Sequence, residues 1–133
     1  MARGNGPAGP DWIVNILVVE DHGDTRTVLS GLLEHCGHSA VTANCVADAL
    51  KVLARNPVDV LLSDLGLPDG DGLELVGKAK KLHPGLTAIA LTARSSDKDH
   101  QLGERAGFDH YLTKPFDFHQ LRTILDSSRK SAA

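Results

Sequence analysis

The chain has 133 residues, of which 41% are hydrophobic, which is enough for one domain with a hydrophobic core and too few for two. Its 17 acidic residues outnumber its 14 basic ones, and no basic stripe with interleaved aromatic residues is present. The composition therefore argues against nucleic-acid binding. No apolar stretch approaches the roughly 18 residues of a membrane span, and the N-terminus lacks the apolar segment of a secretion signal. We expect a cytoplasmic domain without membrane contact.

The two ends of the chain differ in composition from the rest. Residues 1–12 are rich in glycine and proline, and such a segment cannot bury enough surface to become ordered. We predict a flexible linker or expression remnant at residues 1–12, one folded domain at residues 13–130 and a disordered tail at residues 131–133.

The first strand and the first helix follow directly after this linker. The apolar run Ile13–Val19 predicts a buried strand. We expect the next helix to begin after Asp24, a plausible N-cap, and to end at Gly37. A short strand at Ser39–Ala43 comes next. The helix carries one apolar side at helical spacing: Val28, Leu29, Leu32, Leu33 and Cys36.

The middle of the chain continues the alternation of helix and strand. A second helix ends at Asn56–Pro57, because proline disfavours helical backbone in the residue before it. The run Val58–Ser63 predicts another buried strand, and the glycines and proline of residues 65–72 predict a loop without regular structure. The second and third helices carry apolar residues at helical spacing: Val46, Ala49, Leu50 and Leu53 in the second, and Leu73, Val76, Ala79 and Leu82 in the third.

The last third of the chain adds two strands and two helices. The strands are predicted at Leu86–Leu91 and Phe108–Thr113. Between them, the polar segment Ser95–Ala106 predicts a helix in which Leu102 is one of few residues that can be buried. The final helix begins near Asp117, with an apolar side formed by Phe118, Leu121, Ile124 and Leu125.

Strand and helix thus alternate five times with no internal sequence repeat. This order predicts an α/β fold, a single doubly wound domain whose parallel sheet is covered by helices on both faces. In such sheets, ligands bind beyond the carboxyl ends of the strands.

Polar side chains stand where the predicted strands end. Glu20 and Asp21 follow the first strand, and Asp64 follows the third. Converging carboxylates repel one another and raise one another's pKa values, so such a site anticipates a cation, and all-oxygen ligands suit Mg²⁺. Thr92 and Lys114 follow the other two buried strands and would add a hydroxyl and an ammonium group.

Several separated motifs stand in order along the chain: Glu20–Asp21, Asp64 within the sequence DLGLPDGDG, Thr92–Ala93, and Tyr111 three residues before Lys114–Pro115. Together they resemble those of response-regulator receiver domains of two-component signalling, and the resemblance covers about residues 13–129. It implies a flavodoxin-like (βα)5 fold with strand order 2-1-3-4-5.

The resemblance implies that Asp64 is the phosphoacceptor for a phosphoryl group from a phosphohistidine. Asp21 and Asp64 would bind Mg²⁺ directly, with Mn²⁺ as an alternative ion, Glu20 would act through water, and the backbone carbonyl of Gly66 would add an oxygen. Lys114 would bind a phosphoryl oxygen, and the Lys114–Pro115 peptide bond would be cis. Such a domain is a self-catalysing phosphoacceptor rather than a turnover enzyme.

The same resemblance assigns Thr92 and Tyr111 to a conformational switch. The Thr92 hydroxyl would bond to the phosphoryl group, and Tyr111 would follow, changing the surface of the fourth helix, fifth strand and fifth helix. A half-buried Tyr111 with its hydroxyl in water is the alternative. Gly66 cannot shield the phosphoryl group, whereas Arg94 is long enough to reach it, and we hypothesise that these two residues tune the lifetime of the phosphorylated state.

Two other functions require residues that this chain lacks. An aspartyl phosphatase of the haloacid-dehalogenase type needs a second aspartate two residues after the nucleophile, where this chain has Gly66. A flavin carrier needs a Ser/Thr-rich turn after the first strand, where this chain is acidic.

His22 adjoins the acidic pair and could sense the site, although a loop histidine is more often inert. Turn formation explains Asp69 and Asp71 better than calcium binding does.

The sequence after the first strand, VEDHGDTR, resembles receivers of hybrid sensor histidine kinases. The partner would be a histidine kinase or a histidine phosphotransfer domain, in the same polypeptide or a separate one, and a parent hybrid protein would itself be a histidine kinase. A stand-alone single-domain response regulator is the alternative.

Overall fold

The computed structural model describes residues 13–93 and 97–131. The predicted linker, Arg94 and the last two residues of the predicted tail lie outside this part of the chain. Within it, no helix combines the length and the apolar character needed to cross a bilayer.

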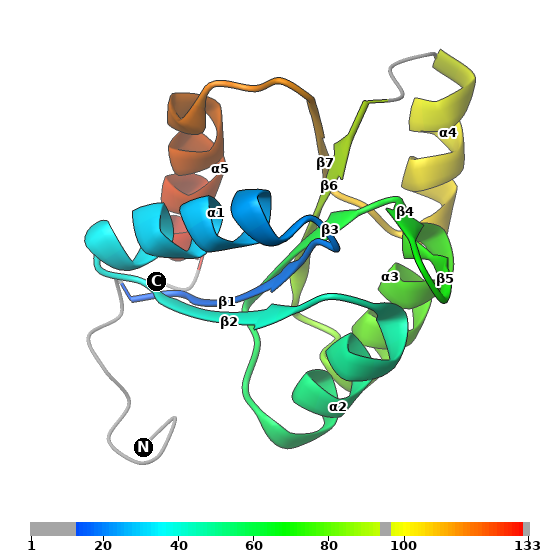
Figure 1. The fold of residues 1–133 in the computed structure, drawn as a ribbon, viewed down its shortest axis with the longest axis horizontal. Helices are drawn as coiled ribbons and strands as arrows, with labels where there is room; N and C mark the ends of the chain where they lie inside the picture. The colour runs from blue at the N-terminus through cyan, green and yellow to red at the C-terminus, as the bar shows by residue number, and fades with distance from the viewer. Residues whose placement is uncertain (1–12, 94–96, 132–133) are drawn as a thin grey trace.

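The core of the fold is a five-stranded parallel sheet with strand order β2-β1-β3-β6-β7. In chain order this is 2-1-3-4-5, so the predicted doubly wound fold is confirmed (Figure 1). The strands are β1 (Asn15–Val19), β2 (Ser39–Ala43), β3 (Val60–Asp64), β6 (Thr87–Thr92) and β7 (His110–Thr113).

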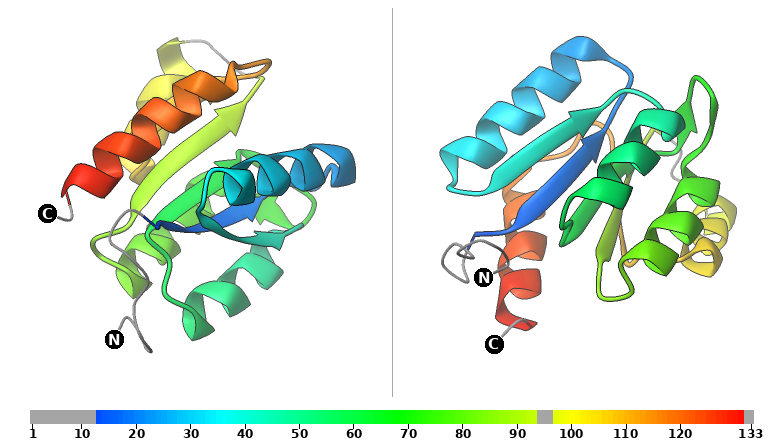
Figure 2. Two further views of the ribbon diagram at one scale, coloured as in Figure 1. Left: turned by 90° about the vertical axis from the view of Figure 1, so that its left-hand side faces the viewer. Right: turned by 90° about the horizontal axis from the view of Figure 1, so that it is seen from below.

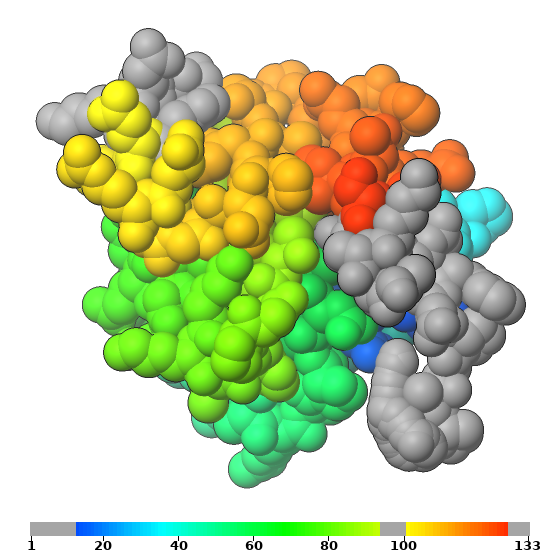
Figure 3. Space-filling model, turned by 180° about the vertical axis from the view of Figure 1, so that it is seen from behind, coloured from blue at the N-terminus to red at the C-terminus, as the bar shows by residue number. Residues whose placement is uncertain are grey.

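Five helices cover the two faces of the sheet. The first and last lie on one face, and the second and third lie on the other (Figure 2). The fourth packs beside the third, and Figure 3 shows the second, third and fourth following one another across the outer surface of this side. The helices are α1 (Gly23–His35), α2 (Val46–Arg55), α3 (Gly72–Leu82), α4 (Asp97–Ala106) and α5 (Phe118–Ser131).

Alternate residues of each central strand enter different hydrophobic clusters. In β1, Leu17 and Val19 pack toward α2 and α3, whereas Ile16 and Val18 pack toward α1 and α5. All four are at most 1% exposed. Burial on both faces is the reason that these strands appear in the sequence as continuous apolar runs.

Helix α1 differs from its prediction in two ways. It begins at Gly23 with His22 as N-cap, so Asp24 lies in the first turn and is not the cap. Its contact with the sheet is made by Leu29 and Leu33, while Val28 and Leu32 are 59% and 38% exposed. The apolar stripe of α1 is wider than the part that the sheet covers. The uncovered residues, Val28 and Leu32, line a groove described below.

Three further expectations need correction. The loop after β3 contains the short strands β4 (Gly66–Leu67) and β5 (Gly70–Asp71), which form an antiparallel pair, so regular structure is present where none was predicted. Helix α3 is buried through Leu75, Val76 and Ala79, whereas Leu82 is 50% exposed because it follows the last turn that faces the sheet. Leu102 of α4, predicted to be buriable, is 42% exposed.

Candidate functional site

The strand register brings the predicted polar residues to one edge of the sheet. Val19 pairs with Ser63, so the next residues, Glu20 and Asp64, lie side by side. On the other side of β3, Asp64 pairs with Leu91, which precedes Thr92. The amide of Lys114 donates a hydrogen bond of 2.7 Å to the carbonyl of Thr92 and so continues the β6–β7 ladder by one residue.

Three carboxylates and one imidazole form a cluster at this edge. Glu20, Asp21, His22 and Asp64 each offer a ligand atom, and these atoms lie within 4.8 Å of one another. The Glu20 side chain is fully buried, that of Asp64 is 15% exposed and that of Asp21 is 35% exposed. The set fits a hard divalent cation, because carboxylate oxygens are its preferred ligands and the more exposed Asp21 leaves room for water.

Lys114 supplies the positive charge that balances two of these acids. Its Nζ atom donates hydrogen bonds of 2.7 Å to Glu20 Oε1 and 2.8 Å to Asp64 Oδ2. Partial burial by itself would lower the pKa of Lys114, but the hydrogen bonds and charges of Asp64 and Glu20 outweigh it and raise the pKa. A buried carboxylate such as Glu20 is tolerated only when it is paired in this way. The Lys114–Pro115 peptide bond is cis, the conformation that the resemblance implies.

The second oxygen of Glu20 faces His22. It accepts a hydrogen bond of 3.2 Å from the His22 backbone N–H and lies 3.1 Å from Nδ1 of the ring. The same Nδ1 is 3.4 Å from Asp21 Oδ1. The hydrogen bond to Glu20, followed by the negative charges of Asp21 and Glu20, raises the pKa of His22. The sequence placed this histidine next to the acids but did not predict that its ring turns toward them.

The segment after Asp64 is fixed by contacts that the sequence did not predict. Asp69 accepts hydrogen bonds from the backbone N–H groups of Val46 (2.7 Å) and Ala47 (3.0 Å), so it caps α2 from 23 residues away along the chain. A Cβ atom added at Gly72 would overlap the backbone carbonyl oxygen of Asp64. Gly72 is therefore required for the close approach of α3 to the end of β3. The glycine in the sequence was a signal, although it was interpreted only as a loop residue.

The loop residue Gly66 lies beside the Asp64 carboxylate. Its N–H donates a hydrogen bond of 3.3 Å to Asp64 Oδ1. A Cβ atom at Gly66 would meet no other atom within 4 Å, so the space above the carboxylate is open on this side. Asp71 accepts a hydrogen bond of 2.9 Å from Leu73 N–H and caps α3. Asp69 also lies in the predicted turn, between β4 and β5, whereas Asp71 ends β5, so capping is a role that the sequence did not predict for either residue.

The two residues assigned to a switch lie beyond the acids. Thr92 is 2% exposed at the end of β6. The half-buried Tyr111 on β7 makes an edge-to-face contact with Phe108, with ring centroids 6.2 Å apart. Its ring and hydroxyl fill the space over Gly103 of α4, where an added Cβ would overlap them. Arg94, the other predicted rate-tuning residue besides Gly66, lies outside the described residues.

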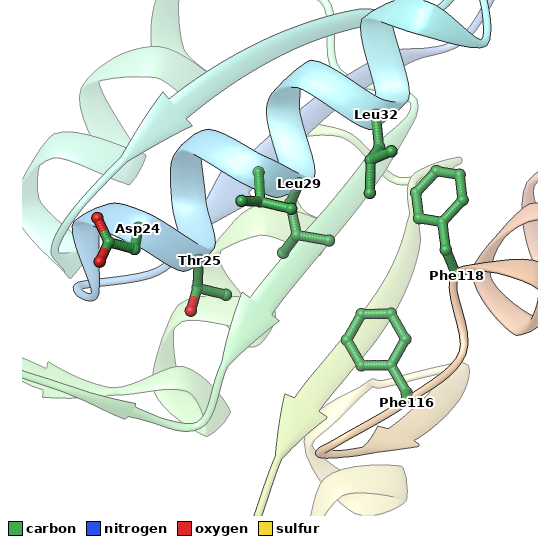
Figure 4. A pocket seen from close by; sticks show the side chains of 7 residues that line it. Asp24, Thr25, Leu29, Leu32, Phe116 and Phe118 are labelled. Atoms are coloured by element: carbon green, nitrogen blue, oxygen red, sulfur yellow. The ribbon is translucent and has the colours of Figure 1, made fainter.

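An apolar groove of about 330 Å³ opens beside this edge, between α1 and the segment that leads into α5 (Figure 4). The groove starts at the rim of the acid cluster, since Asp24 is three residues after Asp21 and Phe116 is two after Lys114. The sequence did not predict it, because the helical spacing of the α1 stripe does not show which of its residues the sheet leaves uncovered. The lining residues are Asp24, Thr25, Val28, Leu29, Leu32, Phe116 and Phe118.

Comparisons with known proteins agree with this arrangement. Residues 16–126 match the family described as the response regulator receiver domain. The chain is 43% identical over 106 residues to an uncharacterized 14.6 kDa protein of Leptolyngbya boryana, covering 78% of this chain and 81% of that protein. It is 36% identical over 110 residues to the sensor histidine kinase RcsC of Salmonella typhi, covering 83% of this chain but only 12% of the kinase.

Solved structures give the same result. A two-component response regulator from Clostridium difficile superposes with a TM-score of 0.84 at 25% identity, over 88% of this chain and 96% of that one. The chain therefore belongs to the response regulator receiver domain family of two-component signalling proteins.

Proposed function

We propose that this domain accepts a phosphoryl group from a phosphohistidine onto Asp64 in a Mg²⁺-dependent reaction. The observation that carries the proposal is the pair of hydrogen bonds by which Lys114 joins Asp64 to Glu20, because it gives one carboxylate of the cluster an adjacent fixed cation. A carboxylate nucleophile and a phosphoryl group are both anionic, so the barrier is largely electrostatic and falls when positive charge is placed beforehand.

In the proposed transfer, an oxygen of Asp64 forms a bond to phosphorus while the bond from phosphorus to the imidazole nitrogen of the donor breaks. The imidazole leaves with the electron pair of that bond, and an acyl phosphate remains on Asp64. Bound Mg²⁺, held by Asp21, Asp64 and the Gly66 carbonyl with Glu20 acting through water, would neutralise charge on the phosphoryl oxygens. The ammonium group of Lys114, which donates a hydrogen bond to Asp64 Oδ2 before the reaction, would donate that bond to a phosphoryl oxygen afterwards.

The phosphoryl group then acts as a signal. It adds about two negative charges and three acceptor oxygens at one side chain. We propose that the Thr92 hydroxyl donates to one of these oxygens and that Tyr111 moves in response, which changes the surface formed by α4, β7 and α5. Tyr111 supports this role because it already lies at the junction of β7 and α4, against Gly103.

The lifetime of the phosphorylated state depends on access of water to Asp64. We propose that Gly66 leaves that access open, consistent with the empty space around its Cα, and that Arg94 hinders it. An Arg94→Ala variant should then lose its phosphoryl group faster, and an unchanged dephosphorylation rate would contradict the assignment.

We propose two arrangements for the protein in which this domain acts, each based on one relative. The match to RcsC supports a receiver module within a hybrid sensor histidine kinase, and the match to a protein of nearly the same length supports a stand-alone regulator. In both cases the partner that donates the phosphoryl group is a histidine kinase or a histidine phosphotransfer domain.

Mass spectrometry tests the central step. Incubation with Mg²⁺ and acetyl phosphate or a phosphoramidate should add one phosphoryl mass to the chain, and the addition should be lost without Mg²⁺ and in Asp64→Asn. Asp59→Asn is a matched control, since Asp59 accepts a hydrogen bond from Asn15 N–H at the opposite end of β1. Phosphorylation of Asp64→Asn together with an unmodified parent would exclude the proposal.

A further inference from the structure

His22 is held against the acid cluster by its position in the chain. It is the N-cap of α1, directly after the acidic pair, and its backbone N–H is bonded to Glu20 Oε2. Nδ1 of the ring faces Glu20 Oε2 at 3.1 Å and Asp21 Oδ1 at 3.4 Å. The side chain is 75% exposed, so water and ions reach the ring freely.

These separations are those found between neighbouring ligands of one metal ion. Ligand atoms bound about 2.1 Å from an ion lie about 3.0 Å apart along an octahedral edge and about 3.4 Å apart along a tetrahedral edge. The ligand atoms of Glu20, Asp21, His22 and Asp64 all lie within 4.8 Å of one another, so Nδ1 of His22 is close enough to join Asp21 and Asp64 around one ion while Glu20 acts through water.

An imidazole nitrogen changes which ion such a site prefers. Mg²⁺ is bound by oxygen ligands and keeps several waters, whereas imidazole suits first-row transition ions such as Zn²⁺ and Co²⁺. A ring that replaces one water therefore adds affinity for transition ions and little for Mg²⁺.

We propose that His22 is a direct ligand of the divalent cation and gives this site a preference for transition-metal ions over Mg²⁺. The inference rests on the proposed function of the acid cluster as a divalent-cation site. It concerns the choice of ion and is independent of whether Asp64 is phosphorylated.

A different role for His22 predicts effects of opposite sign. If the ring served only as a positive counter-charge for the acids, its removal would strengthen the binding of every divalent cation by a similar factor. If the ring is a ligand, its removal weakens the binding of transition ions selectively. The two roles are thus separated by the ratio of Co²⁺ affinity to Mg²⁺ affinity.

The experiment titrates the whole chain with Mg²⁺ and with Co²⁺ at pH 7.5. Co²⁺ bound at this site is identified as the fraction that excess Mg²⁺ displaces. In His22→Ala, the Co²⁺ affinity should fall about tenfold or more, and the Mg²⁺ affinity should change less than about threefold. The visible spectrum of the displaceable Co²⁺ should change as a nitrogen ligand is lost. His35→Ala removes an exposed histidine from the last turn of the same helix and should alter neither affinity.

Zn²⁺ added to ¹⁵N-histidine-labelled protein gives a second readout. The Nδ1 resonance that disappears in His22→Ala should shift on Zn²⁺ binding. The inference is overturned if Nδ1 does not shift, if both affinities change by the same factor, or if wild-type protein binds no Mg²⁺-displaceable Co²⁺. If Asp64 is not phosphorylated but the ion selectivity depends on His22, the proposed function is refuted and the inference stands. If Asp64 is phosphorylated but His22→Ala has no effect on the ion selectivity, the proposed function stands and the inference is refuted.

Discussion

Lys114 Nζ lies 2.8 Å from Asp64 Oδ2, although the two residues are 50 positions apart in the chain. The same Nζ lies 2.7 Å from Oε1 of the fully buried Glu20. One ammonium group therefore neutralises the proposed phosphoacceptor and a neighbouring buried carboxylate. A divalent cation that enters the cluster lies close to the ammonium of Lys114 and is repelled by its charge, which couples metal binding to the lysine.

Replacement of Lys114 by methionine should strengthen Mg²⁺ binding. The uncharged thioether side chain would leave the two carboxylates without their ammonium partner, and removal of a positive charge a few ångströms away should raise the affinity by about tenfold. Without Mg²⁺, the variant should unfold more easily, by about 1–3 kcal/mol, because Glu20 is left buried without its ion pair. Calorimetric titration and urea unfolding measure the two effects.

The matched control for Lys114→Met is Lys81→Met, which removes an exposed lysine from the end of α3. Equal Mg²⁺ affinities for wild-type protein and Lys114→Met would show that Lys114 does not compete with the cation.

Gly72→Ala should destabilise the domain and displace the acceptor. The new Cβ would overlap the carbonyl oxygen of Asp64 and lie 3.0 Å from Leu65 Cα. Overpacking of this kind costs about 1–3 kcal/mol, and phosphorylation by acetyl phosphate should slow because the backbone of Asp64 must shift. Gly77→Ala is the control on the same helix. Its Cβ would meet no atom within 4 Å, so it should stabilise the domain by about 0.5–1 kcal/mol. A stable, normally phosphorylated Gly72→Ala would contradict the close approach.

The sequence predicted the sheet and the acids at its edge because both depend on local patterns. Apolar runs such as Val58–Ser63 identify buried strands, and the parallel order brings their carboxyl ends together. Contacts between distant segments leave weaker signals. The cap that Asp69 provides for α2 and the fit of Gly72 against Asp64 depend on how α2 and α3 pack, which no local pattern specifies. The helical period of α1 likewise gave the direction of its apolar stripe but not the width that the sheet covers, so the 59% exposure of Val28 was not predicted.

Asp69→Asn should change the acid stability of the domain. Hydrogen bonds from the N–H groups of Ala47 and Val46 lower the pKa of Asp69 from its ordinary value of 3.8. A group with a lowered pKa in the folded state stabilises it above pH 3.8, and this contribution is lost as the pH falls through the lower folded-state value. The Asp69→Asn variant should therefore melt at a lower temperature than wild type at pH 7, and the difference should shrink below pH 3.8.

Thermal melts of both proteins between pH 7 and pH 3 measure this difference. Asp48→Asn neutralises an acidic residue in the first turn of the same helix and controls for the loss of charge alone. A difference in melting temperature that stays constant over the whole pH range would rule out the ionised cap.

Gly103→Ala should move the Tyr111 ring, because the added methyl group would overlap it. The chain has a single tyrosine, so protein labelled with 3-fluorotyrosine gives one ¹⁹F signal that reports this ring alone. We expect the signal of Gly103→Ala to differ from that of wild type before any phosphorylation. The variant should also lose about 1–3 kcal/mol of stability, and the added change Tyr111→Ala should make the Gly103→Ala substitution much less costly.

Gly31→Ala, whose Cβ would meet no atom within 4 Å on α1, should leave the ¹⁹F signal unchanged. An unshifted signal in Gly103→Ala would mean that the helix, and not the ring, gives way.

The apolar groove between α1 and α5 should contribute to recognition of the phosphohistidine partner. Val28 and Leu32 are exposed on α1, the helix that starts at the acid cluster. The groove runs between this helix and the segment with Phe116 and Phe118 (Figure 4). We therefore expect a protein that brings a phosphohistidine to Asp64 to contact these residues. Val28→Asp should slow phosphotransfer from the cognate kinase by about tenfold or more, because an apolar contact is replaced by a charge. Loading by acetyl phosphate, which needs no docking surface, should be unaffected. Leu82→Asp places the same charge on an exposed apolar position of α3, 50% exposed against 59% for Val28, and should leave both rates unchanged. Parallel losses with both donors in Val28→Asp would indicate damage to the site itself, and a normal rate with the kinase would exclude the groove from docking.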